Sequence, residues 1–201
     1  IGKLMAQIHC LTKNREQKRI TYTHETLLNQ SLENIREFLS DETDEMQFLM
    51  AVRPLLEKKL LEADNNRLRK GIVHLDIWFD NLNISDKNEI TLFDFDFCGN
   101  GWLCLDIAYY ILQLHSTEKD EIERDKKMKA FYSGYETIEK ISDEERLLIP
   151  TLGVCLYYFY LGVQCKRFDN WSNTFLNEVY LKRFITVLIK GYYEKERDIK
   201  S

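Results

Sequence analysis

Apolar residues recur three or four positions apart along most of this chain, which is the spacing of a helix with one buried face. The first 13 residues carry such a face at Ile1, Leu4, Met5 and Ile8. The same pattern predicts further helices over residues 31–39, 44–61, 104–114, 118–140, 143–163 and 175–188. The segment 14–30 is polar and aperiodic and is predicted to be a loop.

Several residues mark the expected helix ends. Ser31 and either Thr43 or Asp44 are predicted N-caps, and Ser142 with Glu145 has the spacing of a capping box. Pro54 predicts a kink or break. The expected buried face of the helix that contains Pro54 comprises Met46, Leu49, Met50, Leu56, Leu60 and Leu61. That of the last helix comprises Phe175, Leu176, Val179, Tyr180, Phe184, Val187 and Leu188.

The pattern changes at Lys70, where short apolar runs replace the helical stripes. Gly71–Val73 is one such run, and Leu82–Ile84 and Ile90–Phe93 are two more, separated by turn residues. The sequence therefore predicts one small β-hairpin within an otherwise helical chain. The expected fold class is α+β, mostly α.

Polar residues that suit phosphoryl transfer lie in and around this hairpin. Asp76 and Asn81 precede it, and Asp94 and Asp96 follow its second strand. Phosphoryl transfer needs a group that orients the incoming hydroxyl and oxygen ligands for Mg²⁺ at the nucleotide phosphates. A loop and a strand end joined by one hairpin could direct these groups to one point.

The spacing His-x-Asp-x-x-x-x-Asn is weak evidence by itself, but its context strengthens it. An apolar strand precedes His74, a hairpin follows Asn81, and Asp-Phe-Asp comes after the hairpin, the order of parts found in kinases. The alternative for Asp76 and Asn81 is a turn or capping pair, and the functional interpretation is preferred. Asp96 is either a metal-site residue or a cap for a turn at Gly99.

The segments GIVHLDIWFDNLNI and ITLFDFDFCGNGWLCLDIAYYI closely resemble the aminoglycoside phosphotransferase and choline kinase superfamily. The opening IGKLMAQIH is similar to a helix of that family that ends in Leu-His. The resemblance implies the helical carboxy-terminal lobe of a protein-kinase-like fold. It also implies an enzyme that transfers the γ-phosphoryl group of ATP or GTP to a hydroxyl of a small molecule such as an aminoglycoside, choline or homoserine.

The same resemblance assigns a role to each matching residue. Asp76 would be the catalytic carboxylate, and Asn81 and Asp94 would bind Mg²⁺ and through it the nucleotide. Asp96 would either assist at the metal or orient a neighbour. His74 would position the loop. Asp106 would be a buried carboxylate that holds the catalytic loop, although from the residues alone it is either a helix N-cap or a loop anchor.

Two departures from the family pattern affect these expectations. Leu75 stands where the family has glycine, and because leucine avoids positive φ, an ordinary backbone conformation is expected there. A Gly-rich loop and a strand lysine for the phosphates are absent from the sequence. We therefore expect a single carboxy-terminal lobe over 1–201 (helical 1–70, catalytic 71–106, helical 107–201), with the amino-terminal nucleotide lobe outside this chain. The alternative is a non-catalytic binding or regulatory module.

Composition and charge exclude some other classes. The formal charge is -5 without a concentrated basic face, so no nucleic-acid partner is expected. The five cysteines lack C-x-x-C spacing and indicate reduced thiols in the cytoplasm. The apolar stretch Thr151–Cys165 is too short for a membrane span and is predicted to be a buried helix. His9, His24 and His115 lack metal-ligand spacing. The sequence does not specify an oligomeric state.

Overall fold

The computed structural model describes residues 1–63, 66–87, 89–167 and 175–198. The chain forms two compact units. The first unit comprises Ile1–Tyr22 and Asp64–Ile149, and the second comprises Thr23–Ala63 and Pro150–Ser201. Helix α6 (Asp143–Lys166) begins in the first unit and ends in the second.

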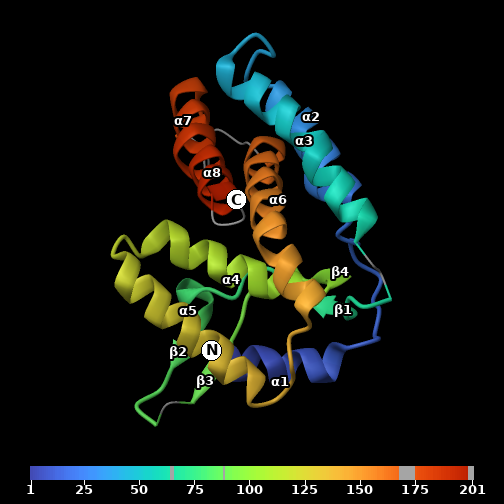
Figure 1. Ribbon diagram of the computed structural model, residues 1–201, viewed down its shortest axis with the longest axis vertical. Coiled ribbons are helices and arrows are strands. Elements are labelled where there is room, and N and C mark those ends of the chain that lie inside the picture. The colour runs from blue at the N-terminus through green and yellow to red at the C-terminus, as the bar shows by residue number, and fades with distance from the viewer. Residues whose placement is uncertain (64–65, 88, 168–174, 199–201) are drawn as a thin grey trace. The chain divides into compact units, whose positions relative to one another are not determined.

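The first unit combines three helices with four short strands (Figure 1). Its helices are α1 (Gly2–Thr12), α4 (Cys104–Thr117) and α5 (Glu121–Glu136). Its strands are β1 (Lys70–Val73), β2 (Leu82–Ile84), β3 (Ile90–Leu92) and β4 (Gly99–Trp102). β2 pairs with β3 in an antiparallel hairpin with Leu82 opposite Leu92, which confirms the predicted hairpin.

A second antiparallel sheet joins β1 to β4, so the expectation of a single hairpin is wrong. The sequence Gly99-Asn100-Gly101-Trp102 has poor strand propensity, because glycine lacks a side chain to pack on a sheet. A Cβ at Gly99 would lie 2.7 Å from Ile20 and Tyr22 atoms. Gly99 is therefore needed for close packing within a strand and does not form the turn expected there.

The predicted loop 14–30 is correct only in its first part. Residues 20–22 run alongside β4 through backbone bonds of Ile20 and Tyr22 to Asn100, and the Asn100 side chain contacts the backbone of Gln17 at 2.9 and 3.0 Å. Residues 25–29 form a π-helical turn that continues into α2 (Gln30–Arg36). Ser31 lies inside this helical segment, where its hydroxyl donates to the carbonyl of Thr26, so the predicted N-cap is wrong. Buried Leu27 and Leu28 explain why the helix starts early.

Helix α3 (Asp44–Glu62) lies in the second unit and begins where the sequence predicted. The Thr43 hydroxyl caps it by accepting the N–H of Met46 at 3.3 Å. The helix runs through Pro54 without the break that the sequence allowed. Its buried face comprises Met46, Leu49, Val52, Leu56 and Leu60, whereas Leu61 is 61% exposed, contrary to prediction.

The capping box at the start of α6 is confirmed in both directions. Ser142 Oγ accepts the N–H of Glu145 at 3.1 Å, and the Glu145 carboxylate accepts the N–H of Ser142 at 3.0 Å. Within the described part of the chain, α6 is the one helix long and apolar enough to cross a membrane, and 72% of its most apolar window is buried inside the protein. Burial of this kind is typical of a core helix, as predicted.

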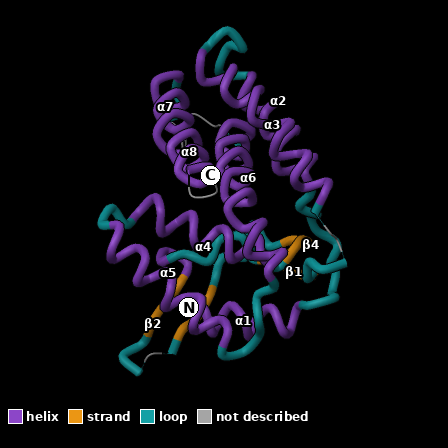
Figure 2. Tube along the Cα trace, viewed as in Figure 1, coloured by secondary structure: helices purple, strands orange, loops and turns teal. Residues whose placement is uncertain are grey.

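The C-terminal helical segment comprises α7 (Glu178–Arg183), a π-helical stretch over Phe184–Lys190 and α8 (Gly191–Asp198) (Figure 2). Val179 and Val187 are 76% and 60% exposed, so much of the predicted buried face is wrong. The buried residues are Leu176, Leu181, Ile185, Ile189 and Tyr192. Leu181, Ile185 and Ile189 lie four residues apart, and the π-helical stretch Phe184–Lys190 has a wider turn than the α-helix on which the expected face was based.

Candidate active site

The catalytic loop begins where β1 ends, and a buried carboxylate from α4 holds its backbone. Asp106 accepts the N–H of His74 at 3.0 and 3.1 Å and that of Leu75 at 2.6 Å. Its side chain is fully buried. Leu103 is the N-cap residue of α4, so Asp106 lies inside the first turn. Of the two structural roles considered for Asp106, the contacts match a loop anchor rather than an N-cap.

A buried histidine from α1 completes the surroundings of Asp106. His9 Nε2 lies 3.0 Å from Asp106 Oδ2, and His9 Nδ1 lies 2.7 Å from the Tyr135 hydroxyl. Nε2–H can donate to the Asp106 carboxylate, while Nδ1 pairs with the Tyr135 hydroxyl. His9 lies in the core. Its contact with Asp106, 97 residues away, was not foreseen.

Leu75 adopts φ 58°, so the expected ordinary backbone conformation is wrong. Two consecutive N–H groups, those of His74 and Leu75, converge on Asp106, and the leucine side chain is completely buried. These contacts hold the residue in the left-handed region, which costs a non-glycine residue about 1–2 kcal/mol. The chain thus reproduces with leucine a backbone conformation that favours glycine.

Asp76 lies on this loop, and each of its carboxylate oxygens accepts a hydrogen bond. The hydroxyl of Tyr109 donates to Oδ1 at 2.6 Å, and Nδ2 of Asn81 donates to Oδ2 at 2.8 Å. Nδ2 of Asn81 also contacts the carbonyl of Asp76 at 3.0 Å. Burial and the bond to Asp76 both raise the pKa of Tyr109, so the phenol keeps its proton. The sequence offered one signal for Tyr109, its position three residues after Asp106 on the same helix.

The hairpin brings Asn81 and Asp94 together. The carbonyl of Asn81 accepts the N–H of Phe93 at 3.2 Å, which extends the β2–β3 ladder by one position beyond Leu82 and Leu92. Asp94 follows directly, with φ 59° and an exposed side chain. Because the amide nitrogen of Asn81 faces Asp76, its Oδ1 has no partner in the described segments. Asn81 Oδ1 and the Asp94 carboxylate are therefore available to a cation.

Asp96 is exposed, and among the described residues its carboxylate makes no hydrogen bond. Its N–H donates to Asp94 Oδ1 at 3.2 Å, and its carbonyl accepts the guanidinium of Arg19 at 2.8 Å. Asp94, and not Asp96, therefore supplies the side-chain oxygen that stabilises this bend. The predicted cap of a turn at Gly99 is wrong.

His74 lies under the loop and is 3% exposed. Its Nδ1 accepts the N–H of Asp76 at 3.2 Å, and its ring meets that of Phe95 edge to face at 4.7 Å. Burial lowers the pKa of His74, against the opposing charges of Asp106, Asp76 and Asp94. A neutral, enclosed histidine suits the loop-positioning role that the sequence suggested.

The donors available at the site fit Mg²⁺ bound together with nucleotide phosphates. In the segments that the structure describes, no group of three or more His, Cys, Asp or Glu side chains could hold a metal by itself. Mg²⁺ usually takes one or two protein ligands and completes its shell with waters and phosphate oxygens. The amide oxygen of Asn81 and the carboxylate of Asp94 are hard oxygen donors of this kind.

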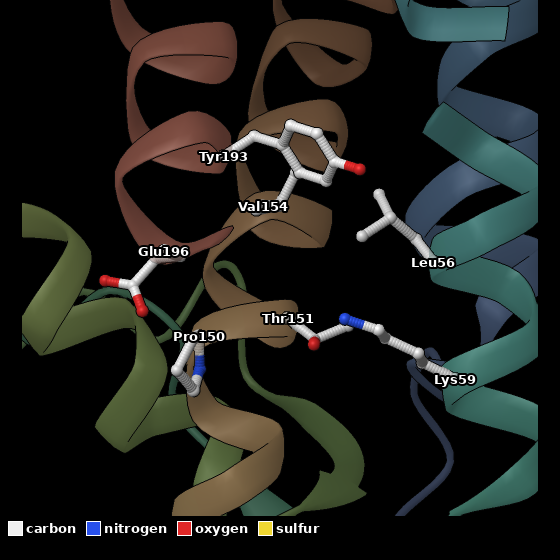
Figure 3. A pocket seen from close by; sticks show the side chains of 7 residues that line it. All are labelled: Leu56, Lys59, Pro150, Thr151, Val154, Tyr193 and Glu196. Carbon is white, nitrogen blue, oxygen red and sulfur yellow. The ribbon is translucent and has the colours of Figure 1, made fainter. Parts of the chain in front are cut away.

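A small pocket lies within the second unit and contains none of the site residues predicted from sequence. It measures about 110 Å³ and is lined from α3, α6 and α8 (Figure 3). Its lining residues are Leu56, Lys59, Pro150, Thr151, Val154, Tyr193 and Glu196. The candidate chemistry is thus confined to the first unit.

Curated relatives match much of this chain. An uncharacterized protein of Synechocystis sp. is 26% identical over 187 residues, which cover 91% of this chain and 50% of that protein. Homoserine kinase of Polaromonas naphthalenivorans is 23% identical over 157 residues, which cover 76% of this chain and 48% of that enzyme. The chain spans about half the length of these relatives.

Two solved structures share the fold. The microcompartment-associated aminopropanol kinase matches with a TM-score of 0.72 at 18% identity, over 96% of this chain and 61% of that one. An amicoumacin kinase, solved with AMP-PNP, Ca²⁺ and Ami, matches with a TM-score of 0.70 at 21% identity, over 94% and 57%. The expected α+β, mostly α kinase-like fold is confirmed.

The family model described as the phosphotransferase enzyme family matches residues 1–141. The match includes α1, the catalytic loop, both sheets, α4 and α5, and it agrees with the resemblance found in the sequence. This chain therefore belongs to the phosphotransferase enzyme family.

Proposed function

We propose that the protein containing this chain transfers the γ-phosphoryl group of ATP or GTP to a hydroxyl of a small molecule. The observation that carries the proposal is the link from Asp76 through Asn81 to the strand end that bears Asp94. Asn81 holds the Asp76 carboxylate at 2.8 Å while its backbone pairs with Phe93, next to Asp94. Because the chain spans about half of its curated relatives, the activity is proposed for the full-length gene product.

Asp76 is the proposed catalytic residue. Its carboxylate accepts the proton of the acceptor hydroxyl while the acceptor oxygen bonds to the γ-phosphorus. The bond between that phosphorus and the bridging oxygen breaks, and its electrons leave with the nucleoside diphosphate. Each carboxylate oxygen of Asp76 accepts one hydrogen bond within the chain, which leaves a further lone pair for the hydroxyl.

Asn81 and Asp94 are the proposed metal ligands. A bound divalent cation neutralises negative charge on the nucleotide phosphates. Mg²⁺ is proposed because both donors are hard oxygens. The amicoumacin kinase structure, which contains AMP-PNP and Ca²⁺, supports a site for nucleotide and divalent metal in this fold. Asp96, whose exposed carboxylate lies two residues after Asp94, is proposed to assist at the metal.

The acceptor is proposed to be a small molecule with an alcohol group. Relatives carry the names homoserine kinase and aminopropanol kinase, and both named molecules bear a hydroxyl and an amine. Amino alcohols therefore come first in a substrate screen. The cytoplasm is the proposed location, because the five cysteines are free thiols, as a reducing compartment would keep them.

The test is a phosphorylation screen with full-length protein, ATP or GTP, Mg²⁺ and a panel of hydroxyl compounds. Asp76→Ala is expected to lower turnover by roughly 100-fold or more, the usual contribution of general acid–base catalysis. Asp80→Ala is the matched control, because this exposed carboxylate of the same loop makes no described contact.

Turnover of Asp76→Ala near the wild-type level would contradict the assignment of Asp76. A full-length protein that binds nucleotide or an acceptor but never transfers phosphate would instead favour the non-catalytic binding module.

A further inference from the structure

Helix α4 carries a second residue that contacts the catalytic loop. We propose that Tyr109 is a positioning residue that fixes the carboxylate of Asp76 for reaction. The inference rests on the proposed function, because it gives Tyr109 a role in the same phosphoryl transfer. It concerns a contact that the sequence pattern of the loop does not contain.

The carboxylate of Asp76 is held from two sides. Tyr109 donates to Oδ1 at 2.6 Å and Asn81 donates to Oδ2 at 2.8 Å, so rotation about the last side-chain bond would break both hydrogen bonds. Hydrogen bonds to ionised groups are stronger than bonds between neutral groups. The carboxylate plane is therefore set before substrate arrives, which removes a reorientation step from the reaction.

Tyr109 is itself well fixed. It is 3% exposed and lies within a 14-residue helix. Catalytic groups are held most accurately by residues whose own rotamers are locked on rigid elements. Asn81 belongs to the same loop as Asp76 and can move with it. Tyr109 belongs to α4, so its hydrogen bond fixes the carboxylate relative to that helix.

Helix α4 thus fixes both the backbone of the loop and the side chain of Asp76. Asp106 accepts the N–H groups of His74 and Leu75, and Tyr109 lies three residues further along the same helix face. Asp106 defines where the loop backbone runs, and Tyr109 defines where the Asp76 carboxylate points. Misplacement of a reacting group by a fraction of an ångström lowers the rate with little effect on substrate binding.

The alternative is that Tyr109 only fills space in the core. Tyr110 offers a matched control, because it is adjacent in sequence and packs in another direction. Its ring stacks on Phe131 with centroids 4.2 Å apart, and no contact with Asp76 is described. Removing the hydroxyl of either tyrosine leaves the aromatic ring in place.

The experiment compares Tyr109→Phe and Tyr110→Phe in the full-length protein. For Tyr109→Phe we expect kcat to fall roughly 10- to 100-fold, as when other groups that orient a catalytic side chain are removed. KM for nucleotide and acceptor should stay within about two-fold, because the phenol is buried and already bonded to Asp76. Tyr110→Phe should keep the wild-type kcat, and thermal unfolding should show that both variants are folded.

A second readout is independent of turnover. Proton NMR of the wild type should contain a downfield hydroxyl resonance from the short Tyr109–Asp76 bond, which Tyr109→Phe removes and Tyr110→Phe retains. If wild-type turnover is found but kcat of Tyr109→Phe equals that of Tyr110→Phe, or the resonance is absent, the role of Tyr109 is overturned. If the wild type shows no turnover with any acceptor, the proposed function fails, and the role of Tyr109 fails with it even if the resonance is present.

Discussion

Two of the non-glycine residues with positive φ lie at the candidate site, Leu75 in the catalytic loop and Asp94 at the proposed metal position. Aspartate tolerates the left-handed region comparatively well, whereas leucine does not. The sequence could not predict the conformation of Leu75, because it is imposed by Asp106, 31 residues away, through the 2.6 Å bond to the Leu75 N–H. Backbone strain at such a position is compensated by the contacts that enforce it.

Because of the strain at Leu75, the glycine variant at this position is predicted to be more stable than the alanine variant, the reverse of the usual order. Both Leu75→Ala and Leu75→Gly lose the buried side chain, at a cost of about 2–5 kcal/mol. Glycine should nevertheless be the more stable of the two by about 1 kcal/mol, because alanine still pays for the left-handed conformation. Denaturant unfolding midpoints measure the difference.

Buried Ile77 has no positive φ and provides the control. At that position the ordinary order should hold, with Ile77→Gly less stable than Ile77→Ala. If Leu75→Gly is less stable than Leu75→Ala, the role given to backbone strain is contradicted.

Elements formed by local contacts were predicted more accurately than those formed by distant ones. The β2–β3 hairpin, the Thr43 cap and the Ser142–Glu145 capping box depend on residues close in sequence, and all three are confirmed. The β1–β4 sheet joins segments about 30 residues apart, one of them rich in glycine, and it was missed. The C-terminal helices were expected at nearly the right place but with the wrong buried face.

The buried face of the C-terminal helices gives a prediction at this scale. Ile185→Ala should destabilise the protein by about 2–5 kcal/mol, because Ile185 is 1% exposed. Val187→Ala should change stability by less than about 0.5 kcal/mol, since Val187 is 60% exposed. Thermal or denaturant unfolding of the two variants decides between the face expected from an α-helical period and the one described for the π-helical stretch. Equal losses would contradict the observed burial.

Across the whole molecule, the sequence identified the residues of the candidate site and two of their supports, His74 and Asp106, but not the other two, His9 and Tyr109. Asp76, Asn81 and Asp94 were found because a short motif and a hairpin connect them. His9 and Tyr109 were missed as site residues because they reach Asp106 and Asp76 over 97 and 33 positions of sequence. Such contacts depend on how the helices pack, and the periodicity of a helix does not specify its partner.

Thiol reactivity tests which cysteines are buried in each unit. Cys104, Cys155 and Cys165 are buried, and burial raises the pKa of each, to about 12 for Cys165. At neutral pH a thiol reagent should label exposed Cys10 and partly exposed Cys98 in the native protein. The three buried thiols should react only after denaturant is added. Peptide mass spectrometry locates the label, and native labelling of Cys155 as fast as that of Cys10 would contradict the described core.

The hairpin register also limits how the length of this segment can vary among homologues. The register pairs Asn81 with Phe93, directly before Asp94, so a single insertion within β2 or β3 would change this pairing, whereas an insertion in the turn between Ile84 and Ile90 would leave it unchanged. Natural length differences are therefore expected in that turn. The paired strands keep a constant length between the two proposed metal ligands, and only the turn can accommodate inserted residues.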